Sequence, residues 1–423
     1  MPASTDTPAA PRIFLLDSGL TRRVGHHAHF GHGLAELCAK ENIPLTTLTP
    51  KNIEPDLAAD LADPRPVFSR NLYQATGNGD MFERAWNDYR AGQRLYSADL
   101  DQSGLQPQST DLFWISTARP REIAGLAEWL LKHEVRPWVA VGYHLLMRPM
   151  TPGSAEGLVH RLAARRLANA VGEDRIFAYA TNHRLARRVA DATNLGIYLA
   201  PLPHFYGAPE GSAGDPPALP SGKGPLIACV GVPRADKIHI PLPQIVREAL
   251  RRRGDLRFVI QVNGAESDSA LMALQDLRHV KLVEGWLDDG AFIALIRAAD
   301  MLLLPYHRDR YAENISGPFA FAAALGRPAI VPSGTWMAER IARKQAAGIV
   351  YKRDAAVIDA LGMAADKLAG LHAQAASLVQ RWRVWDAEAL LRVIRQWAAG
   401  EGTGKLRRVG PQPPSPAAPA DSA

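Results

Sequence analysis

The sequence predicts an α/β protein made of two Rossmann-like domains in tandem. Three observations support this fold class: short apolar runs alternate with amphipathic helical patterns in both halves, a stretch rich in Gly, Pro and Ser separates the halves, and the alternation then restarts. Such alternation produces βαβ units and parallel sheets. With 423 residues and 47% hydrophobic content the chain can supply two cores, which excludes a single small module.

In the first half, strand-like apolar runs alternate with helical periodicity. The predicted strands cover 12–17, 43–49, 111–116, 136–144, 175–180 and 196–201. The predicted helices cover 30–41, 121–134 and 155–171, and a further one begins at Asn182. Because parallel strands need crossover helices, this order predicts one parallel sheet.

The second half repeats the pattern. Its predicted strands cover 225–232, 256–262, 279–285, 300–306 and 328–333. Its predicted helices cover 242–253, 269–277 and 288–299, and a small apolar helix lies within "AENISGPFAFAAALGRPAI", residues 312–330. The order predicts a second Rossmann-like domain.

Composition sets the domain boundaries. Residues 207–224, "GAPEGSAGDPPALPSGKG", cannot bury enough apolar surface to fold and are interpreted as a linker. We therefore expect an N-terminal domain over 12–206 and a C-terminal domain over 225–400, whose last helix can pack back on the first domain. Residues 1–11 and 401–423 are expected to be disordered tails.

The bulk numbers favour a cytoplasmic, soluble protein. No segment has eighteen uninterrupted apolar residues, and the N-terminus has no basic start. Cys38 and Cys229 are far apart, so we expect two buried thiols without a disulfide or a metal site. The net charge of +6 and the pI near 9.3 are too mild to indicate nucleic acid as a partner.

Basic residues recur at helical spacing in two places. They are Arg161, Arg165 and Arg166, then Arg184, Arg187 and Arg188. A solvated helix face explains them, and so does peripheral contact with an anionic membrane surface or an anionic acceptor.

Open parallel sheets bind ligands at the carboxyl ends of their strands, so the loops after the strands are the candidate site. Two such domains that face each other would form a cleft there. The loop after the first strand, "DSGLTRRVGHHAHFGHG", contains Gly25, where the backbone can approach a ligand, and then a run of histidines. These histidines are His26, His27, His29 and His32. Hydrogen bonding to an acceptor or phosphate, helix capping, and a metal site remain open, although no acid or Cys completes a typical metal site nearby.

Other strand ends carry further candidates. His144 ends the strand at 136–144 and suits a contact to a sugar hydroxyl, or is a core histidine; His204 is a weaker candidate. Arg234 and Lys237 precede a helix, where cations, free amides and the helix dipole together favour a diphosphate. Two solvated loop cations are the alternative.

The stretch at 312–330 places Glu313 before a helix that begins near Ser316 and Gly317, where a ligand can approach backbone amides. A similar helix start follows at "PSGTWMAER", with Gly334 and Glu339.

These residues resemble the carboxyl-terminal half of retaining glycosyltransferases with the GT-B fold, the large group 1 family that includes sucrose synthases. The resemblance rests on "VEGWLDDGAFIALIRAAD", "AADMLLLPY", "ALGRPAI" and a Gly turn followed by "AE". It is good over 225–350 and looser over 13–205. It implies a GT-B fold and transfer of a sugar from a nucleotide-diphosphate sugar with retention of configuration.

The resemblance also implies roles for single residues. Glu313 matches the acid that lies against the transferred sugar, Lys237 one of the two diphosphate-binding cations, and Glu339 the acid after the final Gly turn. Two positions depart from the family: Phe321 stands where a Glu usually holds the ribose, and Val232 stands where Arg is usual, so that Arg234 would have to compensate. A phenyl ring cannot accept the ribose hydrogen bonds.

We therefore expect a hexosyltransferase with Glu313, Lys237 and His144 as catalytic residues. Arg234, Lys237, Ser316, Gly317 and Glu339 would bind the donor, and Gly25, His26 and His27 the acceptor, which would be a glycan or a lipid-linked sugar of bacterial polysaccharide biosynthesis. No metal or other cofactor is expected, because "DLD" at 99–101, which resembles a metal motif of other glycosyltransferases, lies in the wrong half. The alternatives are a catalytically impaired binding protein and another nucleotide-sugar enzyme such as an epimerase.

Overall fold

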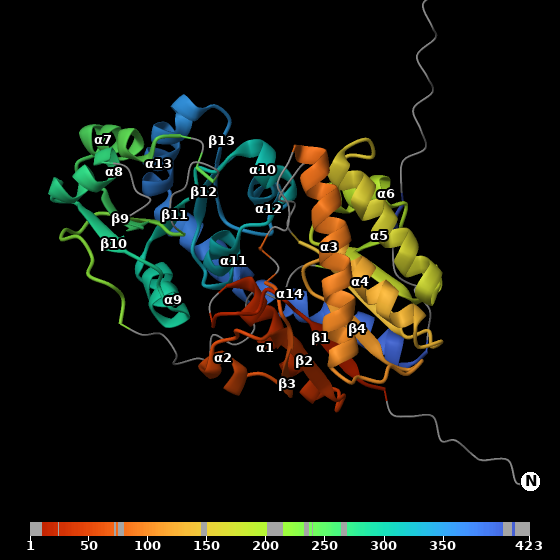
Figure 1. Cartoon of the computed structure of the whole chain (residues 1–423). Helices are drawn as coiled ribbons and strands as arrows, with labels where there is room; N and C mark the ends of the chain where they lie inside the picture. Colours follow the sequence, from red (N-terminus) through yellow and green to blue (C-terminus); the bar gives the residue numbers. More distant parts are fainter. Residues whose placement is uncertain are drawn as a thin grey trace, which may run out of the picture. The chain divides into compact units, whose positions relative to one another are not determined.

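The computed structural model describes residues 11–23, 25–71, 73–74, 80–144, 150–200, 215–231, 237–238, 240–263, 269–400 and 408–410, with the backbone alone at 383–389 and 408. The chain forms two compact units (Figure 1). Unit 1 contains Met1–Arg22, Cys38–Ala200 and Arg392–Ala423, and unit 2 contains Arg23–Leu37 and Pro201–Leu391. Each is an α/β unit with its own sheet, which confirms the predicted fold class.

Unit 1 contains an eight-stranded sheet with the order β14-β7-β6-β5-β4-β1-β2-β3. Its strands are β1 (Ile13–Leu16), β2 (Leu45–Pro50), β3 (Pro64–Phe68), β4 (Leu112–Ile115), β5 (Trp138–Tyr143), β6 (Ile176–Ala180), β7 (Ile197–Leu199) and β14 (Arg408–Val409). All neighbours pair in parallel except β14, which is antiparallel to β7. The direction of chain progression reverses between β1 and β4, which is the switch point where ligands bind in doubly wound sheets.

The helices that lie between these strands in the sequence are α1 (His26–Lys40), α2 (Pro55–Ala59), α3 (Met81–Gln102), α4 (Pro120–Leu131), α5 (Ala155–Val171), η1 (Glu173–Arg175) and α6 (His183–Thr193). Helices α3 to α6 pack side by side in one layer (Figure 1). Their starts are encoded locally: Asp80 forms a capping box with Glu83, and Ser154 and Asn182 cap α5 and α6. The predicted helix start at Asn182 is confirmed.

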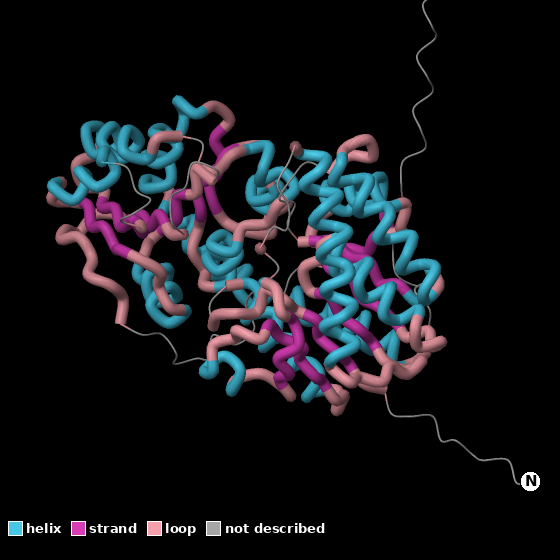
Figure 2. The backbone as a smooth tube through the Cα atoms, in the orientation of Figure 1, coloured by secondary structure: helices cyan, strands magenta, loops and turns pink. Residues whose placement is uncertain are grey.

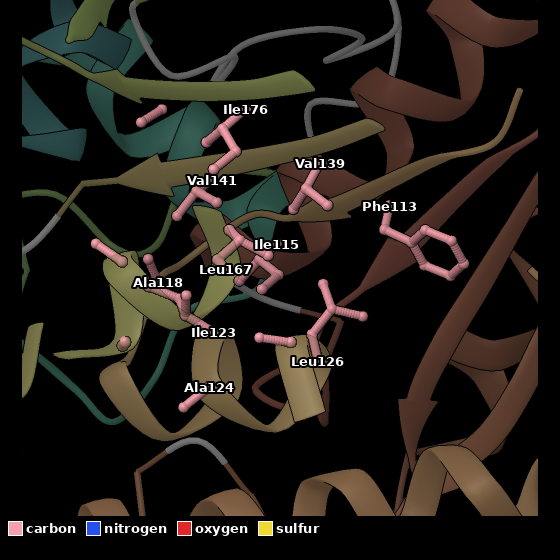
Figure 3. Packing of buried hydrophobic residues seen from close by; sticks show 14 of the residues in the cluster. Phe113, Ile115, Ala118, Ile123, Ala124, Leu126, Val139, Val141, Leu167 and Ile176 are labelled. Carbon is pink, nitrogen blue, oxygen red and sulfur yellow. The ribbon is translucent and has the colours of Figure 1, made fainter. Parts of the chain in front are cut away.

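The core of unit 1 lies between the sheet and this helix layer. Figure 3 shows apolar side chains of β4, β5 and β6, such as Ile115, Val141 and Ile176, which belong to one cluster with Ile123 and Leu126 of α4. These strands are buried along their whole length, which explains why they appear in the sequence as continuous apolar runs rather than as alternating ones.

Unit 2 contains a six-stranded parallel sheet with the order β10-β9-β8-β11-β12-β13. Its strands are β8 (Leu226–Cys229), β9 (Arg257–Val262), β10 (Val280–Glu284), β11 (Met301–Leu303), β12 (Ala329–Pro332) and β13 (Gly348–Tyr351). The order is again that of a doubly wound sheet, with its switch point between β8 and β11.

The helices of unit 2 surround this sheet, and Figure 2 traces their alternation with the strands. They are α7 (Leu242–Arg252), α8 (Ser269–Met272), η2 (Ala273–Asp276), α9 (Asp289–Ala298), α10 (Arg308–Glu313), α11 (Gly317–Ala324), α12 (Trp336–Ala342), η3 (Asp354–Ala356), α13 (Val357–Asp366) and α14 (Leu368–Ala398). Two apolar clusters fill its core, one around Phe319 and Trp382 and one around Phe258.

Two helices contribute residues to both units. The first part of α1, up to Leu37, belongs to unit 2, and α14 belongs to unit 1 from Arg392 onward. Within unit 1, Arg395 of α14 forms an ion pair with Glu41 at 2.7 Å. The predicted boundary at 207–224 stays a prediction, because residues 201–214 lie outside the described part of the chain.

Both cysteines are buried free thiols, as predicted. Burial raises the pKa of Cys38 and of Cys229 to about 12, so neither thiol is reactive near neutral pH. Within the described residues, no helix is both long enough and apolar enough to cross a bilayer.

Candidate functional site

Lys237 lies at the switch point of the unit 2 sheet. Its carbonyl oxygen accepts a hydrogen bond from His307 N at 3.0 Å, and the next residue, Ile238, forms an antiparallel bridge with Tyr306. Tyr306 and His307 lie three and four residues after the end of β11, so these bonds fix the loop after β8 to the loop after β11. The sequence placed Lys237 before a helix but gave no reason for its position against β11.

The Lys237 ammonium group is held by the backbone and by an aromatic ring. Nζ donates to Gly231 O at 3.1 Å and lies 4.8 Å from the centre of the Tyr306 ring. A β-carbon at Gly231 would overlap this ammonium group and would lie 3.4 Å from Pro318 Cγ, in the first turn of α11. The ammonium group therefore lies beside the start of α11.

Gln261 of β9 stabilises the same loop. Its Oε1 accepts from Gly231 N at 2.7 Å, and its Nε2 donates to Gly285 O at 3.0 Å. One buried side chain thus fixes the loops after β8 and β10 to each other. Arg234 and Val232, the other positions of this predicted site, lie outside the described residues.

The start of α11 is close to what the sequence predicts. Ser316 is the N-cap, and its hydroxyl accepts from Phe319 N at 3.3 Å. Pro318 has no amide hydrogen, so Gly317 N–H is the donor left over in this first turn among the described contacts. A β-carbon at Gly317 would meet no atom within 4 Å, so there is space beside the helix start for a ligand group.

Glu313 is the last residue of α10 and is partly buried, whereas the sequence suggested a loop. Arg308, at the start of α10, forms an ion pair at 2.6 Å with Asp354, which follows the edge strand β13. Three residues separate Glu313 from Gly317, so α10 ends just before α11 begins.

Glu339 lies in α12, which begins after the Thr335 cap. Its carboxylate pairs with Arg343, one turn later, at 2.8 Å. Gly334, with a φ of 82°, supplies the turn before the cap. A donor contact by Glu339 would therefore compete with an ion pair inside its own helix.

Phe321 packs against two aromatic rings of unit 2. Its ring makes edge contacts with Phe292 of α9, at 5.3 Å between centroids, and with His29 of α1, at 5.5 Å. His29 Nε2 also lies 3.4 Å from Asp289 Oδ1. The position that the resemblance assigns to a ribose-binding acid is thus part of an aromatic contact. The acid in this set of contacts is Asp289, which lies beside His29.

The predicted acceptor residues lie at the start of α1. His26 and His27 have ring centroids 4.1 Å apart. Gly25 precedes them with a φ of 92°, and a β-carbon there would meet no atom within 4 Å. His27 is buried and His26 is partly exposed. By the division into units they belong to unit 2, so the acceptor assignment to the first domain does not follow from their packing.

His144 directly follows β5 in unit 1, at the strand end where the sequence places it, and it is buried. Its ring centroid lies 5.6 Å from that of Tyr179 on β6, whose hydroxyl accepts from Trp114 Nε1 at 2.7 Å. A β-carbon at Gly142 would overlap the carbonyl oxygen of Ser116 and lie 2.8 Å from His144 Nε2. The close approach of these groups thus depends on Gly142.

We expect Gly142→Ala to lower the free energy of unfolding by about 2 kcal/mol or more, because the added methyl group overlaps backbone that cannot move freely. Chemical denaturation of the variant measures this loss. Gly153→Ala is the matched control, since a β-carbon there meets no atom within 4 Å. Equal stability of the two variants would contradict the described packing around His144.

A cluster that the sequence analysis missed lies at the β1–β4 switch point of unit 1. Both oxygens of the buried Asp17 accept hydrogen bonds, Oδ1 from Gly19 N at 2.9 Å and Oδ2 from Ser116 Oγ at 2.7 Å. Ser18 Oγ donates to Glu122 Oε1 of α4 at 2.5 Å. Burial raises the pKa of Glu122 to about 7, against the opposing effects of the Arg121 charge and the Ser18 hydrogen bond.

The remaining sequence candidates have structural partners. Asp99 accepts hydrogen bonds from Ser69 N and Oγ, each at 2.9 Å, and Asp101 pairs with Lys132. Among the residues that the structure describes, no group of three or more His, Cys, Asp or Glu side chains could hold a metal ion. His204 lies outside the described residues.

The basic helix faces are only partly solvated. Arg161 donates to the carbonyl oxygens of Ala192 and Asp191, and Arg166 donates to Gln93 at 2.8 Å. Arg165, Arg184 and Arg187 have exposed side chains. Contact with an anionic surface therefore stays a prediction, and it would depend on these exposed arginines.

No family model and no curated protein matches the sequence at a significant level. Several solved structures share its fold. They include sucrose-phosphate synthase from Thermosynechococcus elongatus, with a TM-score of 0.60, 15% identity and coverage of 93% of this chain and 100% of that chain. The glycotransferase of kitacinnamycin has a TM-score of 0.58, 12% identity and coverage of 92% and 99%. A putative UDP-N-acetylglucosamine 2-epimerase from Listeria monocytogenes has a TM-score of 0.56, 12% identity and coverage of 92% and 96%. At these identities the likeness establishes the GT-B fold alone, which confirms the fold expected from the resemblance.

Proposed function

We propose that the protein is a glycosyltransferase that takes its sugar from a nucleotide-diphosphate donor bound to unit 2. The observation that carries the proposal is Lys237. Its ammonium group lies at the β8–β11 switch point, beside the start of α11. A cation and a helix N-terminus at a switch point together favour an anionic, diphosphate-like ligand.

The chemistry of transfer fits these groups. When the bond between the anomeric carbon and the diphosphate breaks, the sugar becomes oxocarbenium-like and negative charge develops on the leaving diphosphate. Lys237 and Gly317 N–H would stabilise that charge. Glu313, at the end of α10, would contact the transferred sugar, as the resemblance implies.

Retention of configuration is part of the proposal. The leaving phosphate can itself accept the proton of the acceptor hydroxyl, so the mechanism requires no strong protein base in unit 2. We propose a glycan or lipid-linked acceptor in bacterial polysaccharide biosynthesis, with His144 as a sugar contact in unit 1. A cytoplasmic location with peripheral contact to an anionic membrane surface, and independence of metal, belong to the same proposal.

A thermal-shift panel of UDP, GDP, ADP, dTDP and their sugars tests donor binding, because a ligand of the folded state raises the melting temperature. Glu313→Gln should keep the shift and lower transfer or slow donor hydrolysis by at least about tenfold, since it removes a charge that acts on the reacting sugar. Asp276→Asn, at an exposed acid of the same unit, is the control. Full activity of Glu313→Gln would show that Glu313 does not act on the transferred sugar.

Phe321 favours a second candidate, a glycosyltransferase-like protein without catalysis, because a phenyl ring in an aromatic contact cannot hold ribose hydroxyls. Nucleotide binding without transfer or hydrolysis of any donor would support it. An epimerase is the third candidate, since some proteins of this fold bear that title. Analysis of the sugar product distinguishes an epimer from a transferred sugar.

A further inference from the structure

The position of the Lys237 ammonium group depends on Gly231. Lys237 Nζ donates to Gly231 O at 3.1 Å, and a β-carbon at Gly231 would lie only 2.4 Å from Nζ. Gly231 has a φ of 78°, a backbone conformation that residues with a side chain rarely adopt. The direction of the carbonyl group that accepts from Lys237 is therefore set by the conformation of Gly231.

Gly231 lies beyond the hydrogen-bonded part of the sheet. β8 ends at Cys229, and its pairing with β9 ends there as well, two residues before Gly231. The amide of Gly231 donates instead to a side chain, Gln261 Oε1, at 2.7 Å. Gln261 thus supplies the kind of bond that a neighbouring strand supplies inside the sheet.

Gln261 is itself held in one orientation. It lies on β9, opposite Val283 of β10, and is buried. Its Nε2 donates to Gly285 O at 3.0 Å, so both ends of its amide are bonded to the backbone. Because Gly231 N–H can only donate and Gly285 C=O can only accept, one orientation of the amide satisfies both. An apolar side chain would satisfy neither group, and a carboxylate only one of them.

Gly231 also packs beside the start of α11. A β-carbon at Gly231 would lie 3.4 Å from Pro318 Cγ, in the first turn of this helix. The main chain of Lys237 is fixed separately, since its carbonyl oxygen accepts from His307 N at 3.0 Å. A change at Gln261 would therefore move the acceptor of the ammonium group relative to α11, while the main chain of Lys237 stays bonded to the loop after β11.

We propose that Gln261 is a positioning residue for the donor site. Through Gly231 it holds the Lys237 ammonium group beside the start of α11, where the diphosphate would bind. Gln261 acts through Gly231 and needs no contact with the ligand. This role rests on the proposed function, because its effect is on the affinity for a nucleoside diphosphate.

Isothermal titration calorimetry of the full chain tests this role, with whichever of UDP, GDP, ADP and dTDP gives the largest thermal shift. Gln261→Met keeps the length of the side chain but removes both hydrogen bonds. We expect it to weaken nucleotide binding by about threefold to tenfold, less than Lys237→Ala, because the cation is displaced rather than removed. Gln261→Asn, a second variant, keeps the amide but is one methylene too short to bond both loops, and it should weaken binding as well.

A double-mutant cycle separates positioning from general stability. In the Lys237→Ala background the ammonium group is absent, so Gln261→Met should change the nucleotide affinity by less than about twofold. A residue that only stabilises unit 2 would lower the affinity by the same factor in both backgrounds. The amide hydrogen of Gly231, followed by hydrogen exchange and mass spectrometry, should exchange faster in Gln261→Met because its acceptor is gone.

Gln93→Met is the matched control. Gln93 is also buried, and both ends of its amide are bonded, Nε2 to Glu128 at 3.2 Å and Oε1 from Arg166 at 2.8 Å, but it lies on α3 of unit 1. This variant should lose stability as Gln261→Met does and should bind the nucleotide like the unsubstituted chain. Circular dichroism confirms that each variant is folded.

Two results would overturn this role of Gln261: Gln261→Met binds the nucleotide as tightly as the unsubstituted chain, or it loses the same factor with and without Lys237. In both cases the unsubstituted chain still binds the nucleotide, so the proposed function stands. If the unsubstituted chain binds none of the four nucleotides, the proposed function itself fails, and the role of Gln261 fails with it.

Discussion

Lys237→Ala should weaken binding of the nucleoside diphosphate that the thermal-shift panel selects by about 10- to 100-fold. Hydrogen bonds to a charged group contribute about 1.5–3 kcal/mol, which corresponds to this range. The Lys237 ammonium group is at the switch point, within reach of the start of α11, and no other cation is described in this loop. Calorimetric titration of the nucleotide measures the effect.

The fold should survive this substitution. Lys237 is partly exposed, and the loop retains its backbone bonds to Tyr306 and His307. Lys223→Ala, which removes an exposed lysine of the same unit, controls for net charge. Lys237→Arg should restore part of the affinity, because it keeps the charge but changes its shape. If Lys237→Ala and Lys223→Ala bound the nucleotide with equal affinity, the assignment of Lys237 to the donor site would be wrong.

Much of the fold could be predicted because buried parallel strands leave continuous apolar runs in the sequence. β3 escaped prediction since Pro64 and Pro66 interrupt its pattern. Proline cannot donate to a sheet ladder, and β3 is accordingly the edge strand. α3 escaped prediction for another reason: its surface is largely polar, and its "DLD" segment was considered only as a metal motif, which was rejected. In the structure Asp99 accepts a hydrogen bond from Ser69 N in the loop after β3.

In the candidate site, too, the residues with a local sequence signature could be predicted and those without one could not. The positions of Ser316 at a helix start and of His144 at a strand end could be predicted because helix starts and strand ends have local signatures, whereas the role of Lys237, Ser316 and His144 in a site stays a prediction. The Asp17–Glu122 cluster could not, because its hydrogen bonds join residues about a hundred positions apart: 99 for Ser116 and Asp17, and 104 for Ser18 and Glu122. No local motif encodes such a pairing.

Phe321 shows a different limit of prediction from the sequence. The resemblance identified the position, and the sequence identified what was missing there. The contacts with Phe292 and His29 come from α9 and α1, two elements that no motif connects to α11. The packing of the Phe321 ring depends on such neighbours in space, which the local sequence pattern does not reveal.

Glu122→Gln should abolish a pH-dependent loss of stability between pH 4.5 and 7. Burial raises the pKa of Glu122 from 4.5 to about 7, so in this interval the folded state binds a proton that the unfolded state has released. The free energy of unfolding therefore falls as pH rises through this interval and is level above it. A shift of this size corresponds to about 3 kcal/mol.

The neighbouring charges define the sign of the effect. Arg121 and Arg119 favour the ionised form and Asp17 opposes it, but burial dominates all three. Glutamine keeps the shape and can still accept from Ser18, so the variant loses the titration without losing the hydrogen bond. Relative to the unsubstituted chain, Glu122→Gln should thus gain stability from pH 5 to pH 8.

Chemical denaturation at pH 5, 6, 7 and 8, followed by circular dichroism, measures the difference between the two proteins at each pH. Other titrating groups contribute equally to both proteins and cancel in this difference. Glu128→Gln, on the same helix but only partly buried, controls for the removal of a glutamate from α4. A constant difference for Glu122→Gln, or one that grows toward acid pH, would mean that Glu122 is ionised in the folded protein.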